Sequence, residues 1–325
     1  MRLKMLRGIL VLVMLFSNAV VIFCAEPDKA THAKRLNQMK TTLKKGPNSD
    51  WCREIEQITG LKGTLDKKEN VYKVTSPRSD LDVQVSGVKL VSSMGLTSWA
   101  AFKNLDNRVM VMGDMVLTEG QVNPVMSVAL ANGLEVTALH NHFLGDSPRI
   151  MFMHISGMGR VKPLSMALAE VFGKIKETAD TKASSSTVKM DAGIDVGKGS
   201  LDLKKIDDIL GVKGQSVGSV YKVVIGKRTK MSGFELGPAM GINTWAAFAG
   251  SDDAAIVDGD FVVFEFQLQS VLKALRKANL TITAIHNHMV GESPRMIFLH
   301  YWGTGKSADL ARGIRFALDI QHRRR

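Results

Sequence analysis

The stretch from Ala138 to His154 reads ALHNHFLGDSPRIMFMH, and it returns from Ala284 to His300 as AIHNHMVGESPRMIFLH. Between the first and the last histidine of each copy, nine of fifteen positions are identical, and most of the others exchange one apolar side chain, or one acid, for another. Six of the eight histidines of the chain fall in these two copies. The sequence therefore indicates where a functional site lies, without naming the reaction or the ligand.

The repetition extends beyond the histidines. Four further segments recur in the same order, and those of the first copy are Ile55–Gly63, Tyr72–Val74, Met94–Phe102 and Gly113–Gln121. From Met94 to His154 the offset between the copies is constant, so no loop in this half differs in length. We therefore expect a duplicated unit of about 120 residues, which is a usual size for a domain.

Changes in composition divide the chain into six segments. These are a signal peptide (1–25), a basic flexible lead-in (26–50), repeat domain 1 (51–172), a linker (173–201), repeat domain 2 (202–318) and a basic tail (319–325). The signal peptide is predicted from three basic residues, an apolar run and Ala25 before a polar stretch. We expect an exported protein, periplasmic or secreted, with no membrane span beyond this segment; an uncleaved anchor is the alternative.

Composition and charge limit the classes of partner. A hydrophobic content of 45% in 325 residues is enough for two folded cores. The net charge of +12 would favour a cell-envelope polymer or a small anionic ligand, although such a charge is more often a solubility feature. No aromatic and basic platform accompanies it, so nucleic acid is not favoured. Beyond the signal segment only Cys52 remains, which excludes an internal disulfide and a thiolate metal cluster and is typical of a packed thiol.

Apolar periodicity predicts an α+β fold for each repeat. A short helix should end at Gly60, and strands are expected at Val71–Thr75 and Val109–Val116. Leu268, Val271, Leu272 and Leu275 have the spacing of one helix face. The histidine strand, a Gly/Ser/Pro turn, another strand and a closing helix should follow. The two repeats are expected to pack as a pseudo-twofold pair.

Two motifs carry a resemblance to a known family. The tandem Trp-Ala-Ala-Phe segments (99–102 and 245–248) and His-Asn-His-x-x-Gly-[Asp/Glu]-Ser-Pro-Arg segments resemble the LppY/LpqO family of bacterial exported proteins. The resemblance covers roughly residues 51–318. It implies an envelope or secreted location, a duplicated domain and no established activity. Its named members are lipoproteins, whereas here Phe23 precedes Cys24, where a lipid attachment signal has a small residue.

The spacing of the histidines favours a metal site. His140 and His142 are two residues apart, as are His286 and His288, so a strand presents both rings on one face. Two imidazoles with a third nitrogen or oxygen ligand form the composition of a zinc site, and two histidines with a carboxylate also suit Fe(II) or Mn(II). The candidates for the third ligand are His154 or His300, Asp146 or Glu292, and Glu119 or Glu265.

The register of a simple hairpin argues against the third histidine. If His142 lies opposite Arg149, then His154 lies opposite Thr137 and its ring points to the face that His140 does not use. A one-residue bulge, or an intervening strand, would be needed to bring the ring to the same face.

Each candidate also has a purely structural interpretation. The six histidines could form a hydrogen-bonded network, and the Asp146/Arg149 and Glu292/Arg295 pairs could hold a turn together instead of recognising an anion. A carboxylate such as Glu119 or Glu265 is favoured near a helix start in any case.

For the residue pairs that recur in both copies outside the histidine stretch, the structural interpretation is the stronger one. Asp114 and Asp260 each follow a glycine and are expected in turns. Trp99 and Trp245 lie in apolar segments and are expected in the core.

Two classes of function remain. The first is an exported protein that binds a divalent metal (Zn, Fe or Mn), with metal-dependent hydrolysis as the reaction considered and Asp146, Glu292, Glu119 and Glu265 as candidate ligands or bases. The second is a non-catalytic envelope binding module, in which Arg149, Arg295 and the histidine pairs hold an anionic or glycan ligand. The sequence leaves open whether the protein is an enzyme, and it contains no catalytic triad motif, P-loop or dinucleotide fingerprint.

Overall fold

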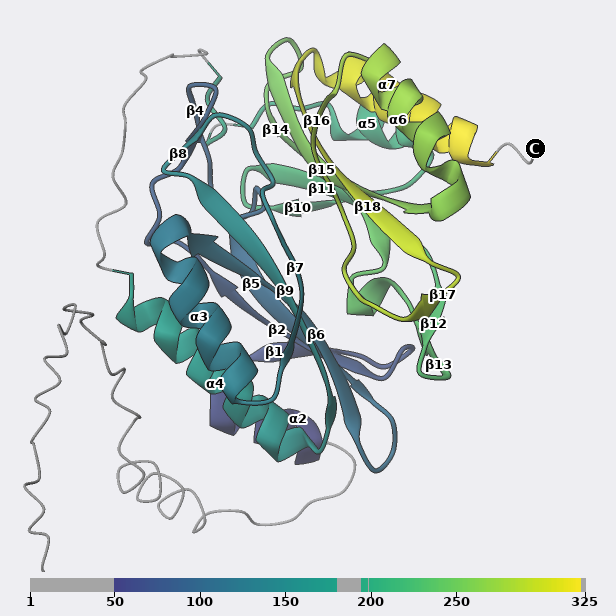
Figure 1. Ribbon diagram of the computed structural model, residues 1–325. Helices are drawn as coiled ribbons and strands as arrows, with labels where there is room; N and C mark the ends of the chain where they lie inside the picture. The colour runs from purple at the N-terminus through teal and green to yellow at the C-terminus, as the bar shows by residue number, and fades with distance from the viewer. Residues whose placement is uncertain (1–49, 180–193, 198, 323–325) are drawn as a thin grey trace, which may run out of the picture. The chain divides into compact units, whose positions relative to one another are not determined.

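The computed structural model describes residues 50–179, 194–197 and 199–322, which belong to one compact unit (Figure 1). The predicted signal peptide, nearly all of the lead-in and most of the linker lie outside the described residues, as does the end of the basic tail. Within the described residues, no helix is both long and apolar enough to cross a membrane.

The first repeat is a six-stranded antiparallel sheet with helices on one face. The strand order is β1 (Gly63–Asp66), β2 (Val71–Pro77), β5 (Thr97–Asn104), β6 (Val109–Thr118), β9 (Ile150–Gly159) and β7 (Glu135–His140). The helices are α2 (Asp50–Thr59), α3 (Glu119–Ala131) and α4 (Val161–Glu177). Their apolar faces and one face of the sheet form a core that includes Ile55, Phe102 and Leu168.

The second repeat has the same strand order and the same helices. Its sheet consists of β10 (Gln215–Val217), β11 (Val220–Gly226), β14 (Asn243–Gly250), β15 (Ala255–Phe264), β18 (Met296–Gly305) and β16 (Thr281–His286). The helices are α5 (Leu203–Leu210), α6 (Leu268–Lys277) and α7 (Ser307–His322), with short 3-10 turns η2 (Pro238–Met240) and η3 (Glu265–Gln267). The α+β prediction is confirmed, and so are the predicted helices and strands, with one exception. Strands β7 and β16 end at the first histidine of each motif, so the prediction that a strand also carries His142 and His288 is wrong. The closing helices α4 and α7 run past residues 172 and 318, where the sequence places the ends of the repeat domains.

Each repeat also forms a small three-stranded sheet at the turn that follows its histidine strand. In the first repeat, β3 (Gln84–Val85) pairs with β4 (Val88–Lys89) and with β8 (Asp146–Ser147). In the second, β12 (Thr229–Met231) pairs with β13 (Phe234–Leu236) and with β17 (Glu292–Ser293). The Gly/Ser/Pro turn is therefore anchored to a preceding loop of its own repeat.

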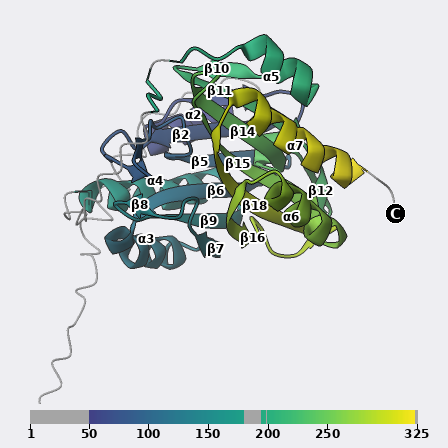
Figure 2. The ribbon, with the colours of Figure 1, turned by 90° about the horizontal axis from the view of Figure 1, so that it is seen from above.

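The two large sheets face each other through the sides that carry no helices. All ten residues of β6 are buried, because one face of this strand meets the helices and the other meets the second repeat. Viewed from above, α3 and α4 lie at one side of the sheets and α6 and α7 at the other (Figure 2).

Two apolar clusters lie between the sheets, and they are equivalent to each other by the pseudo-twofold symmetry of the repeats. One cluster combines Leu96 and Phe143 of the first repeat with Ala247 of the second. The other combines the equivalent Ile242 and Met289 of the second repeat with Ala101 of the first. Because each repeat contributes its loop to one cluster and its sheet to the other, the two repeats are expected to unfold together.

Candidate metal centre

The register of strands β7 and β9 places the third histidine on the face of the first. Strands β7 and β9 pair Val136 with Ile155, but then pair Ala138 with His154, so Thr137 is the extra residue. On the turn side of Thr137, His140 pairs with Phe152 in the same register, which is one residue away from that of the simple hairpin. The simple-hairpin expectation is therefore wrong, because a shift of one residue turns a side chain to the opposite face. The second repeat has the same bulge between Ile282 and Ala284.

All six histidines of the two motifs lie in one cluster between the sheets. The rings of His140 and His286 are 3.8 Å apart between centroids. His142 lies 3.6 Å from His300 of the other repeat, and His288 lies 4.1 Å from His154. Each His-x-His motif is therefore completed by the third histidine of the other repeat, an arrangement that no pattern within one repeat could reveal.

Several sets of ligand atoms in this cluster are close enough to share one metal ion. Three sets have all their ligand atoms within 4.8 Å of one another: His140, His286 and His300; His154, His286 and His288; and Asp114, His140 and His154. Two of the three sets combine residues of both repeats. Three nitrogen or oxygen ligands with room for water are a usual coordination for a catalytic divalent metal.

The ring nitrogens are buried and short of hydrogen-bond partners. Nδ1 of His140 lies 3.2 Å from the carbonyl oxygen of Asn141, and Nδ1 of His154 lies 3.3 Å from that of Gly113, while both Nε2 atoms have no partner. A ring that donates from Nδ1 to a carbonyl keeps a lone pair on Nε2, which is the usual arrangement of a metal-binding histidine. Neither ring nitrogen of His142, His286 or His300 has a partner among the described residues. Buried polar atoms without partners are rare and costly, so a bound ligand would remove that cost.

Burial keeps these imidazoles neutral. It lowers the pKa of His140 to about 4 and that of His154 to about 3, and it lowers the pKa of the other four well below the ordinary value. Repulsion between the neighbouring rings lowers the pKa of five of the six further. Neutral imidazole is the form that binds a metal ion.

Two aspartates complete the cluster, and the prediction that they lie in turns is wrong. Asp114 lies inside β6 opposite His154, and Asp260 lies inside β15 opposite His300. Oδ2 of Asp114 is 3.8 Å from Nε2 of His142, and Oδ2 of Asp260 is 3.3 Å from Nε2 of His288. Burial raises the pKa of Asp114 to about 6 and that of Asp260 well above its ordinary value. An acid inside the otherwise apolar run VMVMGDMVLT was the signal that could have placed it in a buried strand.

The acids of the two Gly/Ser/Pro turns accept hydrogen bonds from the backbone of their own turns. Oδ2 of Asp146 accepts a hydrogen bond of 2.6 Å from the backbone N–H of Ile150, and Oε1 of Glu292 accepts one of 3.0 Å from that of Met296. Neither residue belongs to the three ligand sets or lines the cavity described below. Their roles as ligands or bases stay predictions.

The other predicted site residues lie at the surface. Glu119 begins α3 and Glu265 begins η3, and both are exposed, as are Arg149 and Arg295. None of these four lines the cavity or belongs to a ligand set. Their predicted roles in catalysis and in anion recognition stay untested.

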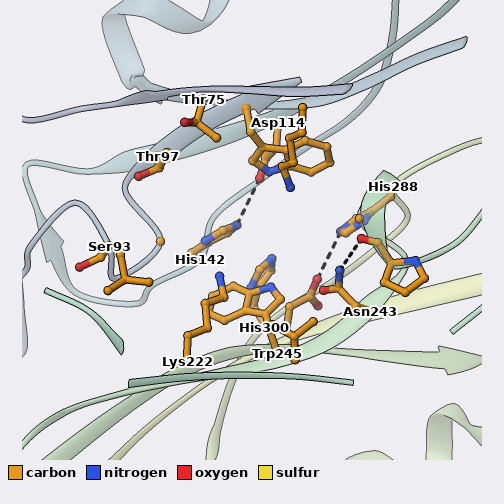
Figure 3. A pocket seen from close by; sticks show the side chains of 18 of the residues that line it. Thr75, Ser93, Thr97, Asp114, His142, Lys222, Asn243, Trp245, His288 and His300 are labelled. Carbon is orange, nitrogen blue, oxygen red and sulfur yellow. Dashed lines mark hydrogen bonds and ion pairs between the residues drawn. The ribbon is translucent and has the colours of Figure 1, made fainter. Parts of the chain in front are cut away.

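A cavity of about 430 Å³ opens beside the histidine cluster. His142, His288, His300, Asp114 and Asp260 line it, so the cluster forms part of its wall. Figure 3 shows His142 and His300 between Asp114 on one side and Lys222 and Trp245 on the other. The cavity gives a small molecule access to the cluster.

Two tryptophan and lysine pairs line the same cavity. Trp99 and Trp245 pack partly against the apolar clusters, which agrees with their predicted place in the core, but each also faces the cavity. Nζ of Lys73 lies 3.9 Å from the ring centroid of Trp99, and Nζ of Lys222 lies 4.0 Å from that of Trp245. Sequence reasoning missed both lysines as site residues, although the repeated Tyr-Lys-Val segment contains them.

Comparison with known proteins identifies a family but no activity. Among curated proteins, no sequence matches this chain. Solved structures with some likeness include the trimeric bacterial microcompartment shell protein PduB and EtuB from Clostridium kluyveri. Each is 12% identical with a TM-score of 0.20, over 79% of this chain and 89% of PduB, and over 80% of this chain and 90% of EtuB. Scores this low do not establish a common fold.

The model of one protein family matches the chain twice. It covers residues 53–174 and again residues 204–320, and each match contains one His-Asn-His motif and its third histidine. The chain therefore belongs to the family described as Domain of Unknown Function (DUF1259), whose domain it carries in two tandem copies.

Proposed function

We propose that this protein binds one or two divalent metal ions in the histidine cluster between its repeats. The observation that carries the proposal is the convergence of buried ring nitrogens without hydrogen-bond partners from both repeats. Imidazole-rich sites suit zinc, and the aspartates beside the cluster also suit Fe(II) or Mn(II).

Elemental analysis of the purified full-length protein tests this proposal. After loading with zinc, iron or manganese and removal of free metal, the wild type should hold one or two equivalents of metal. The His140→Ala/His286→Ala variant should lose this metal, because His140 and His286 together take part in all three ligand sets. The matched control is His322→Ala, which removes an exposed histidine in the last turn of α7. Wild-type protein that holds none of the three metals would refute the proposal.

A hydrolytic activity is the reaction class that this site could support. Three of the histidines line the cavity, so a water bound to the metal there would be open to a substrate. A divalent metal lowers the pKa of a bound water and makes it a nucleophile near neutral pH. Turnover of activated ester and phosphoester substrates that is lost with a chelator and restored by metal would support hydrolysis. The same metal-loaded protein without turnover would favour a binding module.

The second candidate is a non-catalytic binding module of the cell envelope. It is favoured by the lysines and tryptophans of the cavity, which are typical of a site that holds an anionic or glycan ligand. Binding without chemical change of the ligand, measured by mass spectrometry of the ligand after incubation, would distinguish this candidate from a hydrolase.

The cellular location belongs to the same proposal. The sequence motifs suggest kinship with the LppY/LpqO-like exported proteins, and residues 1–25 have the pattern of a signal peptide. We expect the protein to be exported to the periplasm or secreted, with its N-terminus close to Glu26 after cleavage. N-terminal sequencing of the protein recovered from a bacterial host tests this expectation, and an intact Met1 in the cytosolic fraction would contradict it.

A further inference from the structure

Lys73 and Lys222 are equivalent residues of the two repeats that share one cavity. Lys73 lies in β2 and Lys222 in β11, each in the same Tyr-Lys-Val segment. Both line the cavity beside the histidine cluster. They are close enough for the charge of Lys222 to lower the pKa of Lys73, although burial lowers it more. Two like charges in one partly enclosed space repel each other, and an anion bound between them would relieve that repulsion.

Neither ammonium group has an acceptor of its own. In the described part of the chain, no hydrogen bond is formed by Nζ of Lys73 or Lys222, and no carboxylate lies within 4.0 Å of either. Each ammonium lies over a tryptophan ring, which stabilises the charge without using its three N–H donors. Six donors therefore remain open to a ligand in the cavity.

The carboxylates of the cavity are directed to the histidines. Oδ2 of Asp114 lies 3.8 Å from Nε2 of His142, and Oδ2 of Asp260 lies 3.3 Å from Nε2 of His288. With neutral histidines, these two acids can balance at most the two lysines. A third acid, Asp258, also acts on Lys222, but burial raises its pKa to about 8, so it adds little negative charge at neutral pH. A bound divalent metal would leave the cavity with net positive charge, which an anionic ligand would balance.

We infer that this cavity is an anion-binding site, in which Lys73 and Lys222 together hold the carboxylate or phosphate group of a small molecule beside the histidine cluster. The inference names the ligand class of the proposed metal site and rests on that proposal for the charge that the metal adds. A cavity of about 430 Å³ is within the range of small-molecule sites. The hydroxyl groups of Ser92 and Ser93, which also line it, are further donors for such a ligand.

Titration calorimetry of metal-loaded and metal-free full-length protein tests the inference. The probes are inorganic phosphate, malonate and glucuronate, so that the phosphate and carboxylate sources are separated. At least one probe should bind the wild type. Its affinity should fall tenfold or more in Lys73→Met and in Lys222→Met, which keep most of the side-chain volume, and binding should be lost in the double variant. The Lys73→Arg/Lys222→Arg variant keeps both charges and should retain binding.

The matched control is Lys227→Met. Lys227 also lies over an aromatic ring, 4.9 Å from the centroid of Phe264, and burial lowers its pKa to about 8, but it does not line the cavity. Its substitution should change the affinity less than twofold. Binding of no probe, or equal binding by the wild type and the Lys73→Met/Lys222→Met variant, would overturn the inference.

Metal content measured on the same samples separates this inference from the proposed function. Bound metal with no bound anion overturns the anion site alone. Lysine-dependent anion binding by a protein that holds no metal supports the anion site and overturns the metal proposal.

Discussion

The asparagine in the middle of each His-Asn-His motif joins the two repeats. Nδ2 of Asn141 donates a hydrogen bond of 3.1 Å to the carbonyl oxygen of Thr283, and Nδ2 of Asn287 donates one of 3.0 Å to that of Thr137. Both acceptors are bulge residues of the opposite repeat. The motif therefore uses its histidines for the cluster and its asparagine to hold the other copy in register.

Replacing either asparagine should weaken the folded state. We expect Asn141→Ala or Asn287→Ala to lower the free energy of unfolding by about 1–3 kcal/mol, because a partly buried carbonyl between the repeats loses its donor. Urea denaturation followed by circular dichroism measures the change. The control is Asn132→Ala, where the amide is exposed and bonds to Val128 within its own helix, and where a smaller loss is expected. Equal losses for the control and the two variants would contradict a role in docking.

Cys52 is a packed thiol, as the sequence predicts. Its side chain is buried in the helix-side core, and burial, followed by the charge of Glu56, raises its pKa from 9.0 to about 11. The thiolate is the reactive form of cysteine, so a higher pKa means less of it at any given pH.

The reactivity of Cys52 should follow that pKa. In the native protein, alkylation by iodoacetamide should stay slow from pH 7 to pH 9 and increase only as the pH approaches 11, since the thiolate forms only there. Mass spectrometry of the peptide that contains Cys52 measures the rate, and the urea-unfolded protein is the control, which should react readily at pH 9. Rapid labelling of the native protein at pH 8 would show that the thiol is not packed as described.

One glutamine in each repeat ties the helix after the central strand to the closing helix. Oε1 of Gln121 accepts a hydrogen bond of 3.0 Å from the backbone N–H of Thr118, and its Nε2 donates one of 2.9 Å to the carbonyl oxygen of Ile175. Gln267 makes the equivalent bonds to Phe264 and Gln321. The start of α3 and the end of α4 are thus connected by one buried amide, and so are η3 and the end of α7.

Removing that amide should weaken the connection between α3 and α4 and lower the stability of the protein. Gln121→Met leaves the N–H of Thr118 and the carbonyl of Ile175 without these partners in a buried place, so we expect a loss of about 2–4 kcal/mol in the free energy of unfolding. Guanidinium denaturation measures it. Gln57→Met, on the exposed side of α2, should change stability by less than about 0.5 kcal/mol. A loss for Gln121→Met no larger than that of the control would refute the role of the tie.

The whole molecule is pseudo-symmetric but not identical in its halves. Met112 of the first repeat packs in an apolar cluster, whereas the equivalent residue of the second repeat is Asp258, a fully buried acid whose pKa burial raises to about 8. Neither carboxylate oxygen of Asp258 has a hydrogen-bond partner among the described residues. The two repeats therefore differ here by one buried acid that burial keeps largely protonated at neutral pH, although the six histidines repeat in both copies.

The shared clusters should make the two repeats unfold in one step, and metal should stabilise that step. Both ligand sets that contain His286 draw residues from each repeat, so unfolding of either repeat would release the ion. At a free zinc concentration of about 100 times the Kd, we expect a gain of about 2.7 kcal/mol. Differential scanning calorimetry with zinc and with a chelator measures it.

The same scans contain their own control. The zinc-dependent shift in Tm should disappear in the His140→Ala/His286→Ala variant, which removes a ligand from all three sets, and persist in His322→Ala. Two separate transitions, or a Tm that zinc does not change, would contradict a single metal centre shared by the repeats.

Sequence alone was enough to predict the duplication, the α+β class, and the places of the main helices and strands. These follow from local periodicity and from the comparison of one copy with the other, which need no knowledge of three-dimensional contacts. It also pointed to the six histidines, because they recur in register inside a segment of constant length.

The combination of these histidines depends on contacts between distant segments of the chain. The pairing of Ala138 with His154, one residue away from the simple hairpin, sets the face on which His154 lies, and the docking of the sheets supplies each His-x-His motif with a histidine from the other copy. The same docking buries Asp114 beside the cluster and brings Lys73 and Lys222 into one cavity. Register shifts and contacts between distant segments arise from packing, which periodicity within one strand does not encode.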